Sequence, residues 1–196
     1  PAVMMIIIFQ TLLMVIGMVT GEEHSNRGIR AYTPFGYGWG VAIRIVAGKT
    51  SVYCALYAIF AFFLLGLLPH FFSIPNIGNG LYIVLLLIPY LMATSFLGLA
   101  ASRYFTDSEA PLLMIAFFSV GLIFLSGVSY PMELMPWYWK AAHYILPAAP
   151  GTLAFVKLNS MGASMADIRP EYITLWIQVF IYFIISIWVY KKKLEI

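Results

Sequence analysis

The sequence predicts an all-α, polytopic transmembrane helical bundle with five spans and with short re-entrant or interfacial helices on its outer side. Hydrophobic residues make up 62% of the 196 residues and charged residues only 10%, against roughly 45–50% and about 25% in soluble domains. The mean hydropathy is +0.91, and the apolar runs are continuous rather than alternating as in a transmembrane β-barrel. So few charges cannot cover a surface that faces water, and we therefore expect a protein that folds in lipid.

The spans follow from apolar runs that contain no charge. A bilayer core about 30 Å thick needs roughly 20 apolar residues per helix. The first run has no basic start and no small-residue cleavage site after it, which favours a span over a signal peptide. Five runs have the required length, and they cover residues 2–20, 50–68, 81–102, 110–130 and 172–190.

The positions of Lys and Arg predict the orientation, because cytoplasmic loops carry an excess of both. One face holds eight of the eleven basic residues: Arg27, Arg30, Arg44, Lys49, Arg103, Lys191, Lys192 and Lys193. The other face holds Lys140, Lys157 and Arg169. The first face is therefore expected to be cytoplasmic, together with the C-terminus. Five spans then put Pro1 outside, so we expect a fragment that at least one further span precedes.

The cytoplasmic segment 21–49 is the most polar part of the chain. It begins with Glu22 and Glu23 and continues with Arg27 and Arg30, an order that suits the dipole of a short helix. Two interpretations stay open. One is a short interfacial or partner-binding helix near its start, and the other is a solvated loop that obeys the positive-inside rule.

Arg44 and Lys49 lie at the start of the second predicted span. We expect both to extend toward the inner headgroups rather than to contact an anionic substrate. The glycine tract 36–40 lacks the Lys-Ser/Thr pair of a phosphate-binding loop, so it does not indicate nucleotide binding.

The outer segment 131–171 is rich in Trp, Tyr and Pro. Aromatic rings settle at the membrane–water boundary, and prolines divide the segment into short pieces. We therefore expect one or two short helices that lie in, or dip into, the outer leaflet. Glu133 and His143 have no nucleophile placed between them, which disfavours catalysis there. His70 has no partner at metal-ligand spacing.

The five predicted spans contain no Asp, Glu, His, Lys or Arg. Proton relays, ion-coupled carriers and intramembrane proteases place such groups at depth. Their absence from the spans argues against those mechanisms within this chain.

The second half of the chain carries a series of short motifs. An apolar run ends in Ser-Gly, and aromatic-Pro, Met-Pro-aromatic and apolar-Pro steps follow it before the last span. In this chain they are Ser126-Gly127, Tyr130-Pro131, Met135-Pro136-Trp137 and Leu146-Pro147. With these motifs the chain resembles the membrane-spanning subunit of an ABC-type exporter of the type-2 permease family, which includes drug and polysaccharide exporters.

The first half resembles that family more loosely. There the family has a cytoplasmic region that docks on the ATPase, and Glu22, Glu23, Arg27 and Gly28 fit its pattern. Ile29 and Arg30 depart from the Thr and Glu that the family often carries after the Gly. The resemblance covers nearly the whole chain and implies that a first span and an extracytoplasmic domain are missing.

The resemblance implies a permease that moves a hydrophobic or amphipathic substrate outward across a bacterial inner membrane. The chain has no Walker motif, so ATP is expected on a separate ATPase subunit, with no catalytic, metal or cofactor-binding residue here. Its expected partners are that ATPase, a second permease copy, the bilayer and a periplasmic adaptor protein, but no nucleic acid. The implied ATPase-coupling residues are Glu22, Glu23, Arg27, Gly28 and Arg30, and the implied outer-gate residues are Pro131, Glu133, Pro136, Trp137, Trp139 and Pro147.

Two other functions remain open at this point. The chain could be a membrane-embedded enzyme that acts on lipid at the outer leaflet through His143 and Glu133. It could also be a scaffold that anchors partners and transports nothing.

Overall fold

A computed structural model of the chain describes residues 2–25, 38–72, 77–102, 104, 111, 121–127 and 135–194. These residues form helices joined by short connections and include no strand, which confirms the predicted all-α bundle. The elements are α1 (Ala2–Ser25), α2 (Trp39–Ala61), the π-helix η2 (Phe62–Leu67), α3 (Leu68–Phe71), α4 (Gly80–Ala101), α6 (Trp137–Ile145), α7 (Ala148–Met161) and α8 (Arg169–Leu194).

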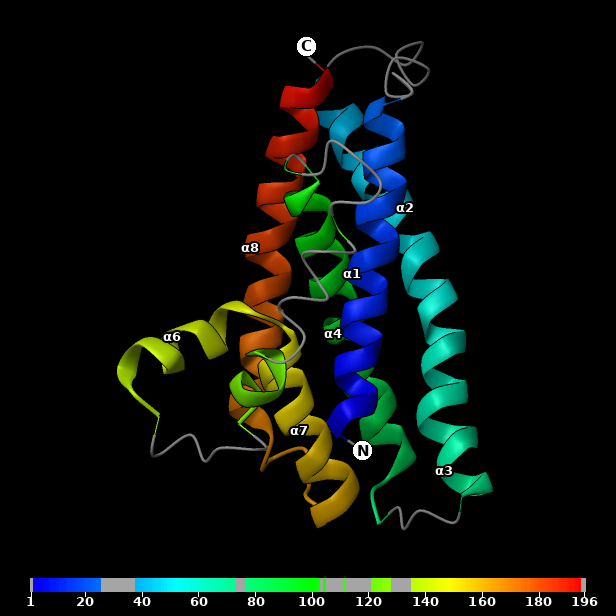
Figure 1. The fold of residues 1–196 in the computed structure, drawn as a ribbon, viewed down its shortest axis with the longest axis vertical. Coiled ribbons are helices and arrows are strands. Elements are labelled where there is room, and N and C mark those ends of the chain that lie inside the picture. The colour runs from blue at the N-terminus through cyan, green and yellow to red at the C-terminus, as the bar shows by residue number, and fades with distance from the viewer. Residues whose placement is uncertain are drawn as a thin grey trace.

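Four helices in the described part of the chain are long and apolar enough to cross a membrane. They cover Ala2–Glu23, Trp39–Phe71, Gly80–Ala101 and Arg169–Lys192, and they run along the long axis of the bundle (Figure 1). Each overlaps one of the predicted spans, although the second begins at Trp39, eleven residues before the predicted start at residue 50. The remaining prediction, residues 110–130, lies mostly outside the described residues, although residues 121–125 are helical.

The helices extend further into the polar segment 21–49 than its composition suggests. α1 continues to Ser25, and α2 already begins at Trp39. Backbone hydrogen bonding continues through polar residues, so a helix can extend beyond the apolar run that spans the membrane. The short helix expected near residues 22–32 falls largely in the range 26–37, which lies outside the described residues.

α4 is the central helix of the bundle. It packs against α1, α2, α7 and α8, and most of its second half is buried. The fully buried Tyr90 of α4 donates a hydrogen bond from its hydroxyl to the Met5 carbonyl of α1, at 2.7 Å. On the other side of the same ring lies Gly151 of α7, where an added Cβ would overlap the ring. The absence of a side chain at Gly151 therefore lets α7 approach α4 closely.

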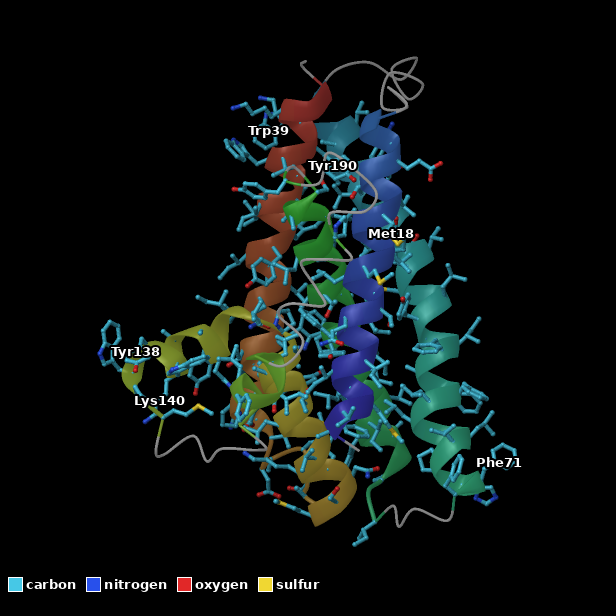
Figure 2. All side chains as sticks on the ribbon, viewed as in Figure 1. Met18, Trp39, Phe71, Tyr138, Lys140 and Tyr190 are labelled. Carbon is cyan, nitrogen blue, oxygen red and sulfur yellow. The ribbon has the colours of Figure 1, made fainter. Side chains whose placement is uncertain are left out.

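The segment 131–171 contains two short helices with different surroundings. α6 projects sideways from the bundle, whereas α7 lies along it and packs on α1, α4 and α8 (Figure 1). Tyr138 and Lys140 lie on the projecting helix (Figure 2). We call α6 and α7 together the hairpin.

Candidate functional site

A cluster of polar side chains joins three helices at the end of the bundle where α8 finishes. Lys49 of α2 donates hydrogen bonds to both carboxylate oxygens of Glu23 on α1, with Nζ 2.6 Å from Oε1. The same Nζ lies 3.4 Å from the Tyr190 hydroxyl of α8 and 5.3 Å from the centroid of that ring. We call Glu23, Lys49 and Tyr190 the Lys49 network. Because both charged side chains are mostly buried, each depends on the other to offset the loss of water.

A second contact reinforces this end of the bundle. Lys191, one residue after Tyr190, places its ammonium 4.5 Å from the centroid of the Trp39 ring at the start of α2. Figure 2 shows Trp39 and Tyr190 near the same end, far from Phe71. The end of α8 is thus attached to α2 through both an ion-pair network and a cation–π contact.

The hairpin breaks between Ile145 and Ala148, and α8 supplies the donors for the break. The last carbonyls of a helix have no partner within it. Gln178 of α8 donates from Nε2 to the Tyr144 carbonyl at 2.8 Å, and the Tyr182 hydroxyl donates to the Ile145 carbonyl. In an apolar environment an unpaired carbonyl is costly. These two side chains, one helical turn apart on α8, therefore stabilise the end of α6.

Two further polar contacts hold the hairpin. His143 is only 1% exposed, and its Nδ1 lies 2.8 Å from the Leu125 carbonyl. Since a carbonyl only accepts, Nδ1 carries the proton in this contact. Burial lowers the pKa of His143, against the opposing effects of the Leu125 carbonyl and the Glu171 charge. Lys157 of α7 pairs with Glu171 of α8, with Nζ 2.6 Å from Oε1.

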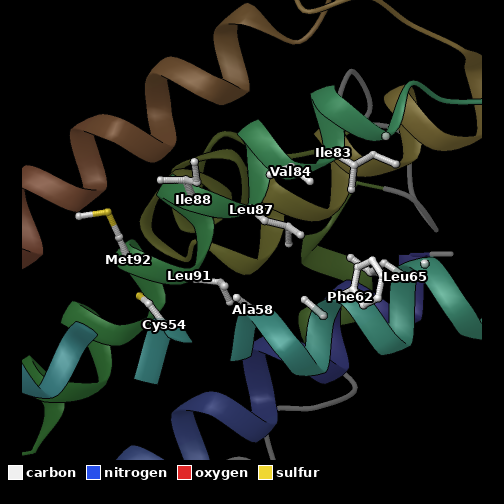
Figure 3. Close-up of a pocket in the computed structure, with 13 residues that line it drawn as sticks. Cys54, Ala58, Phe62, Leu65, Ile83, Val84, Leu87, Ile88, Leu91 and Met92 are labelled. Atoms are coloured by element: carbon white, nitrogen blue, oxygen red, sulfur yellow. The ribbon is translucent and has the colours of Figure 1, made fainter. Parts of the chain in front are cut away.

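An apolar cavity of about 620 Å³ opens between α4 and the continuous helix formed by α2 and η2 (Figure 3). Its lining includes Cys54, Ala58, Phe62, Leu87 and Leu91 and contains no charged side chain. The thiol of Cys54 is its one titratable group, so the cavity offers nothing for acid–base chemistry. It suits an apolar occupant.

The model of the ABC-2 family transporter protein matches residues 1–188. The chain belongs to the ABC-2 transporter family. The match covers nearly all of the chain, and it confirms the resemblance that was based on the sequence motifs. No curated protein and no solved structure matches the chain at a significant level.

Family membership establishes the broad function. The chain is a permease component of an ABC transporter and a multi-pass membrane protein, and the family implies an ABC ATPase as partner. Among the described residues of this ABC-2 permease no group of three His, Cys, Asp or Glu side chains is arranged to hold a metal ion.

The predicted coupling residues of the permease have different surroundings. Glu23 is engaged with Lys49, whereas Glu22 is exposed near the end of α1. Arg27, Gly28 and Arg30 lie outside the described residues. Lys49 was expected to extend toward the inner headgroups, but its ammonium is hydrogen-bonded to Glu23 instead. Sequence reasoning treated the two as separate, although an acid at the end of one span and a base at the start of the next is a signal for such a pair.

The predicted outer-gate residues of the permease are partly described. Pro136 and Pro147 immediately precede α6 and α7. At the start of a helix the missing N–H of proline costs no hydrogen bond, because N–H groups there have no partner within the helix. Trp137 is 81% exposed and Trp139 is also exposed. Pro131 and Glu133 lie outside the described residues. Gln178 and Tyr182 were absent from the prediction, and their signal was a Gln and a Tyr one turn apart within an apolar span.

Proposed function

We propose that the chain is the transmembrane subunit of an ATP-driven exporter that moves a hydrophobic or amphipathic substrate outward across a bacterial inner membrane. ATP is bound and hydrolysed by a separate ABC ATPase, and two permeases and two ATPases form the working unit. The family match over residues 1–188 carries the permease assignment. A periplasmic adaptor protein is a further proposed partner.

The end of the bundle with the Lys49 network is proposed to face the cytoplasm and the ATPase. The basic run that starts at Lys191 lies at this end, which supports the orientation by the positive-inside rule. Glu22, Glu23, Arg27, Gly28 and Arg30 are then the coupling residues. Glu23 has a second role, because its bond to Lys49 links α1 to α2 and, through Tyr190, to α8.

The opposite end is proposed to hold the outer gate, formed in part by the hairpin and the segment that leads into it. ATP-driven closure of the ATPases pushes on the end of α1, the spans tilt, and a path between two permease copies opens outward. The predicted gate residues Pro131, Glu133, Pro136, Trp137, Trp139 and Pro147 belong to this region. The exposed aromatic rings of α6 suit a position at the outer membrane boundary.

An apolar or amphipathic cargo suits the composition of this chain better than an ion does. The large cavity is lined by apolar side chains, and the predicted spans carry no charged residue. A lipid-acting enzyme that uses His143 receives no support from the geometry, since that imidazole is buried and bonded to a backbone carbonyl. A structural role accounts for it.

Reconstitution tests the proposal. The full-length protein and its ATPase are placed in proteoliposomes, and uptake of a fluorescent amphipathic dye is measured with ATP and with a non-hydrolysable analogue. We expect dye transport that requires hydrolysis. We further expect the double variant Glu22→Lys, Arg27→Glu to keep ATP hydrolysis and to lose at least fivefold in transport. Ala166, an exposed position in the connection before α8, provides a surface control as Ala166→Lys.

Transport without ATP hydrolysis would overturn the exporter assignment. Full transport by the Glu22→Lys, Arg27→Glu variant would overturn the docking role while leaving the exporter assignment in place.

A further inference from the structure

The middle of α8 carries two buried polar side chains that a membrane helix does not need for packing. Gln178 is 3% exposed and Tyr182 is 9% exposed, and a buried polar group is costly unless it is hydrogen-bonded. The Oε1 atom of Gln178 has no hydrogen-bond partner among the described residues. The amide is therefore satisfied through Nε2 alone, which bonds to the hairpin.

Both acceptors lie at the end of α6, where the hairpin backbone leaves the helix. Leu146 is extended, with φ −96° and ψ 124°, and Pro147 after it has no N–H to donate. The carbonyls of Tyr144 and Ile145 thus receive hydrogen bonds from α8 side chains rather than from the following residues. Side chains of α8 therefore hold the backbone at the junction between α6 and α7.

The same helix also reaches the Lys49 network. α8 is continuous from Arg169 to Leu194, and Tyr190 lies eight residues beyond Tyr182, which is about 12 Å along a helix axis. Tyr190 is 2% exposed and contacts the Lys49 ammonium. One rigid helix therefore joins the proposed ATPase side to the break in the hairpin.

We propose that Gln178 and Tyr182 are positioning residues of the outer gate, and that α8 carries a displacement of the Lys49 network to the hairpin through them. The proposal rests on the exporter function above. A shift or rotation of α8 moves both donors together, and the α6 end follows because its carbonyls have no alternative donor within α6. Lys157–Glu171, at the far end of α8, keeps α7 attached during that movement.

The test uses the full-length protein with its ATPase in proteoliposomes. Tyr182→Phe and Gln178→Met remove the donors while keeping side-chain size. Ser186→Ala is the matched control, because it removes a buried hydroxyl of α8 that bonds only within the same helix, to the Phe183 carbonyl at 2.8 Å. We expect the double variant to lose at least threefold in substrate transported per ATP hydrolysed, with hydrolysis within twofold of the wild type. The control should keep the wild-type ratio.

A fluorescent label reports the movement itself and is independent of cargo. Tyr138→Cys places a thiol on the exposed part of α6, in a background where other thiols, including Cys54, have been replaced. We expect ATP to change the access of a soluble quencher to this label in the wild type and the control, but not in the double variant.

The outcomes separate the two proposals. An ATP response of the label that persists in the double variant, or that is missing in the wild type, overturns the positioning role. Absence of ATP-dependent transport in the wild type, with the label response intact, overturns the exporter function instead.

Discussion

At the scale of single residues, buried charges matter more than their small number suggests. Lys49 and Glu23 share two hydrogen bonds across 26 positions of sequence and are mostly shielded from solvent. Removing one partner from a buried pair leaves an uncompensated charge, which in full burial costs about 3–5 kcal/mol. Because this pair keeps partial exposure, a smaller effect is expected.

The first prediction concerns this pair. Glu23→Gln should lower the free energy of unfolding by about 1–3 kcal/mol and the melting temperature of the detergent-purified protein by several degrees. The charge swap Glu23→Lys, Lys49→Glu should recover most of the loss, because the pair is rebuilt in reverse. Thermal melts followed by size-exclusion chromatography measure both. A swap variant no more stable than Glu23→Gln would contradict the pairing.

The second prediction concerns pH and His143. Burial lowers the pKa of this imidazole below its ordinary value of 6.5, so the folded state binds fewer protons than the unfolded state between the two values. The contribution of His143 to the free energy of unfolding is therefore fully present above pH about 6.5. It declines as the pH falls from there toward the lower pKa of the folded state. We expect a lower melting temperature at pH 5.5 than at pH 7.5.

His143→Gln serves as the comparison, because glutamine keeps a donor for the Leu125 carbonyl and does not titrate. Its melting temperature should change less between the two pH values. An equal change in both proteins would assign the pH dependence to other groups.

At the scale of elements, the packing of α7 on α4 depends on a glycine. Tyr90 is fully buried, and its hydroxyl is bonded to the Met5 carbonyl of α1. The ring cannot swing away without breaking that bond. Gly98, about two turns further along α4, is close to Ile16 of α1, and an added Cβ there would lie 3.0 Å from two side-chain carbons. Close helix approach at small residues is a general device of membrane bundles.

The third prediction follows from this contact. Gly151→Ala should destabilise the protein strongly, by about 1–3 kcal/mol or more, because overpacking displaces a fixed ring and backbone. Gly48→Ala in α2 is the control, since nothing lies within 4 Å of an added Cβ there, and alanine is the better helix former. Melting temperatures of the two variants should change in opposite directions or differ by several degrees. Equal stability would contradict the Tyr90 contact.

The continuous helix from α2 to α3 forms one wall of the large cavity. The backbone passes through the π-helix η2 before α3, and π-helical segments occur frequently at functional sites. Phe62 and Gly66 of η2 both line the large cavity. The helix thus contributes one wall of the cavity, and α4 contributes the other (Figure 3).

At the scale of the whole molecule, the ion pairs of the described residues lie at the two ends of an apolar bundle. The Lys49 network lies at one end, the Lys157–Glu171 pair at the other, and the Gln178 and Tyr182 bonds lie between them on α8. Hydrophobic burial drives little association inside lipid, so packing and such hydrogen bonds decide how membrane helices fit together. In a chain with only 10% charged residues, each of these contacts therefore matters for how the helices are held together.

Fold class could be predicted from composition, and the approximate positions of the described spans from the apolar runs along the sequence. A bilayer of nearly constant thickness selects apolar runs of about 20 residues, and such runs can be found along a single chain. The break before Pro147 was also predictable, because a proline restricts the backbone locally. The family resemblance could be recognised for a similar reason, because motifs such as Met135-Pro136-Trp137 are contiguous in the sequence, and the family match over residues 1–188 confirms it.

The contacts that position the candidate site could not be predicted in this way. Glu23 and Lys49 are 26 residues apart, Gln178 and Tyr144 are 34, and Tyr90 and Met5 are 85. Each contact depends on how its helix is rotated about its own axis, and one residue changes the facing direction by about 100°. One or two polar residues in an apolar span give only a weak signal of that rotation. Which donors meet which carbonyls is therefore settled by close packing of small and large side chains between helices.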